Sequence, residues 1–67
     1  MNVVREYLQD YGQEFKDLRI QAKLTQLKVA KCLGCSQAII SHIECGYMLP
    51  PEQLEMELHN LYYDLIK

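Results

Sequence analysis

The sequence predicts an all-α domain, a bundle of four to five helices, and two observations support that prediction. Apolar residues recur every three or four positions along most of the chain, which is the spacing of a buried helical face. Residues that begin or end helices, such as Thr25, Gly34 and Ser36, fall at the edges of these stretches. Because 67 residues suffice for one domain and no more, we expect residues 1–67 to form a single domain.

The first third of the chain carries an amphipathic stripe that contains a glycine. The apolar positions of the stripe are Val4, Tyr7 or Leu8, Tyr11, Phe15, Leu18 and Ala22. Gly12 lies within it, and glycine costs a helix about 1 kcal/mol relative to alanine. We therefore expect one helix near 2–11 and a second near 13–23, with a single long helix as the alternative.

Two short helices are predicted in the middle of the chain. Thr25 is a good N-cap for a helix over 26–33, and Gly34 suits the position just after its end. Ser36 then caps a helix over 37–44, which Cys45 and Gly46 end. The apolar positions of the first of these helices are Leu27, Val29, Ala30 and Leu33. The expected inward residues of the pair are Val29, Leu33, Cys35, Ile40 and Ile43.

A last helix is predicted from Pro51 to about Ile66. Proline is favoured at the first helical position, and Glu52 in the first turn suits the helix dipole. The apolar face of this helix consists of Leu54, Leu58, Leu61, Tyr62 and Leu65.

Charge is segregated along the chain although the net charge is only −2. Residues 16–31 contain five basic residues and one acid, whereas residues 32–67 contain five acids and one base. Such a distribution orients a molecule toward an anion with one face forward.

Residues 26–45, QLKVAKCLGCSQAIISHIEC, satisfy together the requirements of two helices that meet at roughly a right angle. Ala30 is small where the helices touch, and Gly34 tolerates a positive φ in the turn. This stretch resembles the helix-turn-helix of the phage repressor/Cro family, which is also found in bacterial regulators. Upstream, FKDLRIQAKLTQ resembles the first helix of the family, and downstream, IECGYMLPP matches its Ile-Glu-x-Gly-x-x-x-Pro pattern.

The resemblance runs from Gly12 to about Leu61 and leaves residues 1–11 outside it as an N-terminal helical extension. It implies a lambda-repressor-like fold and a sequence-specific transcriptional regulator that binds duplex DNA through the second helix of the motif. The residues that it assigns to base contacts are Gln37, Ala38, Ser41 and His42. Those that it assigns to phosphate contacts are Gln26, Lys28, Lys31 and Tyr47. It also implies a structural ion pair between Arg19 and Glu44.

A single helix-turn-helix reads few base pairs, so we expect a homodimer. We place Tyr62, Tyr63 and Ile66 in its interface. The apolar residues of the extension, Val3, Val4, Tyr7, Leu8 and Tyr11, should pack on the core or extend that interface. The alternative is a monomer in which these residues cover one another.

The predicted recognition helix contains no Lys or Arg and exposes Ile39, because Ile40 and Ile43 already define its inner face. This composition favours an alternative function. The chain would then be an antirepressor with the same fold, and Ile39, His42 and Tyr47 would anchor it on a repressor protein.

We expect neither a metal, a cofactor nor an enzymatic activity. Cys32 and Cys35 would need two further zinc ligands, and only His42 and Cys45 are near. His42 and His59 have no evident catalytic partner, and His59 is expected at the surface. The absence of a signal peptide or an apolar span predicts a cytoplasmic protein without a membrane partner.

Overall fold

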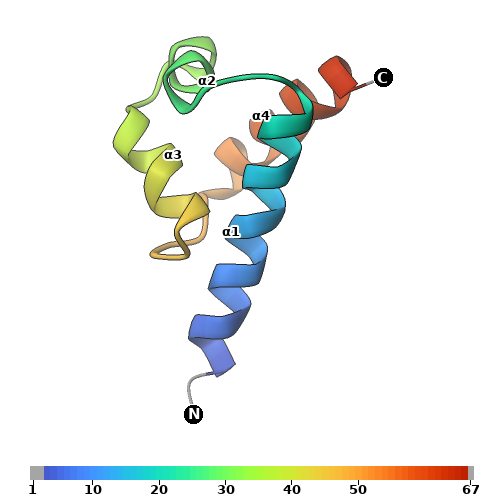
Figure 1. The fold of residues 1–67 in the computed structure, drawn as a ribbon. Helices are drawn as coiled ribbons and strands as arrows, with labels where there is room; N and C mark the ends of the chain where they lie inside the picture. The colour runs from blue at the N-terminus through green and yellow to red at the C-terminus, as the bar shows by residue number, and fades with distance from the viewer. Residues whose placement is uncertain (1–2, 67) are drawn as a thin grey trace.

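Residues 3–66 of the computed structural model form four α-helices packed around one core, without a strand (Figure 1). The helices are α1 (Val3–Gln21), α2 (Gln26–Leu33), α3 (Gln37–Glu44) and α4 (Glu52–Ile66). The all-α prediction is confirmed, at the lower of the two helix numbers expected. Helix α3 contacts both α1 and α2, while α4 packs mainly along α1.

Helix α1 continues without a break through Gly12, so the predicted division into two helices is wrong and the single-helix alternative is right. A β-carbon at Gly12 would clash with the carbonyl oxygen of Ile43 and would lie 2.8 Å from that of Glu44. The glycine therefore serves close packing of α1 against the end of α3. That packing offsets the cost of glycine inside a helix.

Helix α1 ends at Gln21, two residues earlier than predicted, because Lys23 adopts a left-handed conformation with φ of 62°. The backbone N–H of Lys23 donates to the carbonyl of Ile20 at 3.0 Å, and that of Leu24 donates to the carbonyl of Arg19 at 3.2 Å. These bonds close the helix in a Schellman motif, in which glycine is the more usual left-handed residue.

The caps predicted for α2 and α3 are confirmed. The Thr25 hydroxyl accepts a hydrogen bond from the Lys28 N–H at 3.1 Å, and the Ser36 hydroxyl accepts one from the Ile39 N–H at 3.3 Å. Gly34, between the two helices, has a left-handed φ of 69°. The α2–α3 turn is therefore built from local capping and one permissive residue.

All four helices contribute to the core, whose buried members are Phe15, Val29, Ala30, Ile40, Ile43, Leu58 and Tyr62. Val29 and Ala30 form the buried face of α2, whereas Leu27 is exposed. Helix α4 begins at Glu52, one residue later than predicted. The carbonyl of Pro51 accepts its first hydrogen bond, from Glu55, at 2.9 Å.

The N-terminal extension packs on the core at one end and projects at the other (Figure 1). The Tyr11 hydroxyl donates a hydrogen bond to the Glu55 carboxylate, and a β-carbon at Gly46 would lie 2.8 Å from the Cα of Gln9. The side chains of Val4 and Tyr7 are exposed. The predicted packing of Val3 concerns a side chain that lies outside the described residues.

Candidate nucleic-acid interface

The four predicted base-contacting residues share one face of α3. Gln37, Ala38 and His42 are exposed and Ser41 is half-buried. Gln37 and Ser41, like Ala38 and His42, are four residues apart, and this spacing places the members of each pair on the same side of a helix. The opposite side carries Ile40 and Ile43, which are buried.

Ile39 is half-buried and packs against the core, so its predicted exposure is only partial. The outer face of α3 is therefore made by fewer residues than the sequence predicted, because Ile39 is partly withdrawn into the core. Its hydrogen-bonding side chains are an amide, a hydroxyl and an imidazole, and neither Lys nor Arg occurs in α3.

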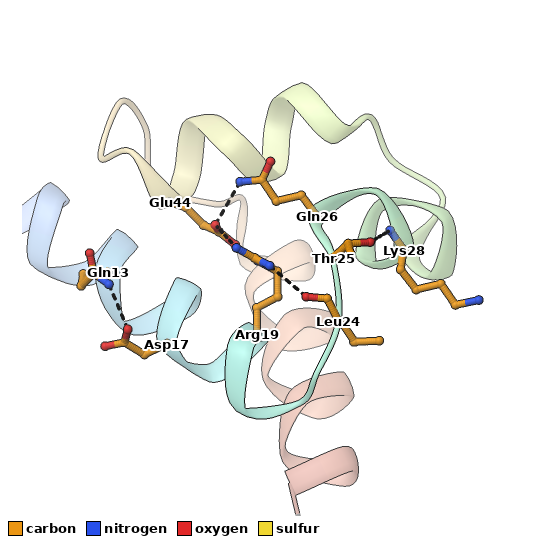
Figure 2. A network of polar contacts seen from close by, with 8 residues as sticks. All are labelled: Gln13, Asp17, Arg19, Leu24, Thr25, Gln26, Lys28 and Glu44. Carbon is orange, nitrogen blue, oxygen red and sulfur yellow. Dashed lines mark hydrogen bonds and ion pairs between the residues drawn. The ribbon is translucent and has the colours of Figure 1, made fainter.

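Three of the four predicted phosphate-contacting side chains are exposed. Lys28 and Lys31 lie on α2, and Figure 2 shows the Lys28 ammonium pointing away from the polar network beside it. Tyr47, in the loop after α3, is 74% exposed, and its ring centroid lies 5.8 Å from that of His42. His42 and Tyr47 thus form an aromatic pair at the C-terminal end of this face of α3.

Arg19 and Glu44 form the predicted ion pair, which joins α1 to the end of α3 (Figure 2). The Arg19 Nε and Nη2 donate to the two Glu44 carboxylate oxygens at 2.7 and 3.1 Å, and its Nη1 donates to the Leu24 carbonyl at 2.8 Å. The side chains are 13% and 3% exposed, respectively. The hydrogen bonds to Glu44 raise the pKa of Arg19 against the opposing effect of burial.

Gln26, the fourth predicted phosphate contact, belongs to the same network. Its amide Nε2 donates to the Glu44 carboxylate at 3.1 Å, and its amide oxygen points away from that carboxylate (Figure 2). An amide nitrogen carries two protons, so one donor remains after this bond. Nothing in the sequence indicated this link, because residues 26 and 44 are distant along the chain.

Tyr62 cannot belong to a subunit interface as predicted, because its side chain is 0% exposed and lies in the core. Its hydroxyl has no hydrogen-bond partner among the described residues. Burial, and then the nearby Glu44 charge, raise the pKa of Tyr62 well above its usual value. Of the other predicted interface residues, Tyr63 is 54% exposed and Ile66 is half-buried.

A series of neighbouring aromatic rings was not predicted from the sequence. Consecutive ring centroids lie 4.9–5.9 Å apart along the series Tyr7, Tyr11, Phe15, His59 and Tyr63. His59 is half-buried and stacks on Phe15, so its predicted surface position is wrong. The four-residue spacings of Tyr7, Tyr11 and Phe15, and of His59 and Tyr63, could have predicted the contacts within each helix. The sequence offered no sign that α1 and α4 bring Phe15 and His59 together.

The three cysteines differ in solvent exposure. Cys32 and Cys45 are exposed and Cys35 is half-buried, where burial, and then the charge of Glu57, raise the pKa of its thiol. No group of three or more His, Cys, Asp or Glu side chains suited to a metal ion occurs within residues 3–66.

Comparison of the chain with protein-family models, curated proteins and solved structures gave no match. Within the part of the chain that the structure describes, no helix has the length and apolar character needed to cross a membrane.

Proposed function

We propose that this protein is a sequence-specific DNA-binding transcriptional regulator with a helix-turn-helix of the repressor/Cro type. The observation that carries the proposal is the outer face of α3. It presents Gln37, Ala38, Ser41 and His42 together, while Ile40 and Ile43 anchor its other side in the core. A rigid helix with small and amide-bearing side chains suits the major groove, where glutamine pairs with adenine and alanine contacts a thymine methyl.

The proposed phosphate contacts come from α2 and from the loop after α3. Lys28 and Lys31 supply the positive charge that α3 lacks, and Tyr47 supplies a hydroxyl. Gln26, at the first position of α2, keeps one amide proton for a phosphate after its bond to Glu44. Such contacts fix the position of a protein on the duplex without reading its sequence.

We further propose that the protein binds DNA as a homodimer, whose interface includes Ile66 near the end of α4. The exposed Val4 and Tyr7 of the projecting end of α1 are candidates to extend it. Two recognition helices about 34 Å apart would then read half-sites one turn apart.

Selection of bound duplexes from a random pool tests the proposal, followed by affinity measurements on the selected site. Gln37→Ala should cost about 1–3 kcal/mol of binding and relax selectivity at one base pair. Gln53→Ala, which removes an exposed glutamine from α4, is the matched control and should leave binding unchanged. Failure to enrich any sequence, or equal binding by the Gln37→Ala variant, would refute the proposed function.

The salt dependence of the same affinities tests the phosphate contacts. Lys28→Ala or Lys31→Ala should weaken binding to all sequences alike and reduce the slope of log affinity against log salt by about 1. An unchanged slope would remove that lysine from the interface.

A second function is favoured by the aromatic pair beside α3. His42 and the largely exposed Tyr47 give this end of the face an apolar component, and Leu49 in the same loop is also exposed. The protein would then be an antirepressor that docks this surface on a repressor protein. In that case Tyr47→Ala would abolish repressor binding, and no duplex would be enriched in the selection.

A further inference from the structure

A groove between α1 and α4 is not used by the proposed function. It is open to solvent, has a volume of about 290 Å³, and is lined by Glu14, Asp17, Leu18, Gln21, His59 and Tyr63. Gln21 follows Gly12 by nine residues, which corresponds to opposite sides of a helix at 100° per residue. Because Gly12 contacts the end of α3, the groove faces away from α3.

One wall of the groove is acidic and comes from α1. Glu14 and Asp17 are three residues apart and therefore adjacent on the helix surface. Both side chains are exposed, and neither is paired with a cation among the described residues. Asp17 accepts a hydrogen bond from the neutral amide of Gln13 at 2.9 Å, which orients the carboxylate without neutralising it (Figure 2).

The other wall is aromatic and comes from α4. His59 and Tyr63 are four residues apart, with ring centroids separated by 5.8 Å. Phe15 stacks on His59 at 4.9 Å with an interplanar angle of 18°, so the core holds this wall in place. The Tyr63 side chain, which lines the groove, nevertheless remains 54% exposed. Leu18 also lines the groove and is half-buried.

We propose that this groove binds an arginine side chain presented by a segment of a partner protein. Carboxylates facing an aromatic wall complement a guanidinium, which donates paired hydrogen bonds from its edge and stacks with its flat face on a ring. The chain's own Arg19 is committed to Glu44, so it does not supply the occupant. The proposal does not depend on DNA binding, because the groove and α3 face different directions.

The test is a titration of the full chain with the peptide acetyl-Gly-Arg-Gly amide, followed by NMR. Saturable shifts are expected at Asp17, Gln21 and Tyr63. The same peptide with citrulline in place of arginine keeps the shape but lacks the charge, and it should not bind. Glu14→Gln combined with Asp17→Asn should weaken binding about fivefold or more, and Tyr63→Ala should weaken it about threefold. Asp17→Asn keeps the acceptor for Gln13, so the fold should be unaffected.

Glu57→Gln is the matched control. It removes one negative charge from α4 near Cys35 rather than from the groove, and it should leave binding unchanged. The double groove variant removes two charges and the control removes one. A loss of binding free energy in the control that reaches half of the loss in the double variant would therefore show general attraction to an acidic protein and overturn the proposal. Equal binding of the citrulline peptide would do the same. Concentration-dependent shifts of the groove residues without peptide would instead identify a second copy of the chain as the occupant, which also overturns it.

Discussion

The two ends of α3 are held in place by different means. At its N-terminal end, Ser36 caps the helix and Gly34 allows the turn, and both residues are exposed. At its C-terminal end, the Ile43 and Glu44 carbonyls pack against Gly12, and the Glu44 side chain is buried in its ion pair with Arg19. One end is fixed by local backbone chemistry, and the other by close tertiary packing.

Gly34, just before the N-terminal end of α3, and Gly12, which packs against its C-terminal end, illustrate these two means. At Gly34 a β-carbon would have no other atom within 4 Å, so the residue is needed for its conformation alone. Gly12 has an ordinary helical conformation that any residue could adopt, so glycine is needed there only because the α3 backbone leaves no room for a β-carbon. We therefore expect substitutions at the C-terminal end of α3 to have larger effects on stability than those at its N-terminal end.

The largest effect is expected for Arg19→Ala. This change leaves the Glu44 carboxylate buried without its cation, which should lower the free energy of unfolding by about 3–5 kcal/mol. Urea denaturation followed by circular dichroism measures it. Arg19→Lys keeps the charge but loses the paired N–H donors, so its loss should be smaller. A double-mutant cycle with Glu44→Ala that gave no coupling would show that the pair does not hold α3 to α1.

Gly12→Ala should be the next most damaging change, at about 2–3 kcal/mol. The new methyl group would meet two backbone carbonyls, which cannot move aside as a flexible side chain would. Gln13→Ala, at the adjacent exposed position, is the control and should have little effect. Helix propensity alone predicts the opposite sign, a stabilisation of about 1 kcal/mol by alanine at position 12. A more stable variant would therefore contradict the close contact.

Gly34→Ala should lower the free energy of unfolding by about 1–2 kcal/mol, because alanine is strained at a φ of 69°. Asparagine tolerates this region better, so Gly34→Asn should lose less. Thermal unfolding of the three proteins compares them directly. If alanine and asparagine cost the same, a factor other than backbone conformation determines the residue at this turn.

The smallest effect at neutral pH is expected for Tyr62→Phe, in the core. Its hydroxyl has no partner among the described residues, so removing it should change stability by less than about 1 kcal/mol. The effect should grow in alkali. Because the pKa of Tyr62 is raised in the folded state, the unfolded chain releases its proton first as the pH passes 10.0, and stability falls.

Tyr62→Phe should therefore make unfolding less sensitive to pH above 10.0. The pKa of Tyr11 is also raised, by burial and then by its hydrogen bond to Glu55, so Tyr11→Phe should remove a second part of the alkaline loss. Tyr47→Phe, at an exposed position, is the control. An alkaline profile identical to that of the unmodified protein would show that Tyr62 does not contribute.

Much of the candidate site was predictable from the sequence because its determinants are local. The caps at Thr25 and Ser36, the left-handed Gly34, and the shared face of Gln37 and Ser41 all depend on residues within one or two helical turns. The Arg19–Glu44 pair came instead from the family resemblance. Its geometry, and the addition of Gln26 to it, required the positions of three separate segments.

The sequence by itself therefore determined four amphipathic stretches, their main start and stop signals, and the face that α3 presents. Only the tertiary structure decided that α1 runs unbroken through Gly12, that Tyr62 fills the core, and that His59 stacks on Phe15. Capping and periodicity act between neighbours along the chain. By contrast, the space available to a residue depends on which segment, distant along the chain, packs against it, and a local sequence pattern does not predict that packing.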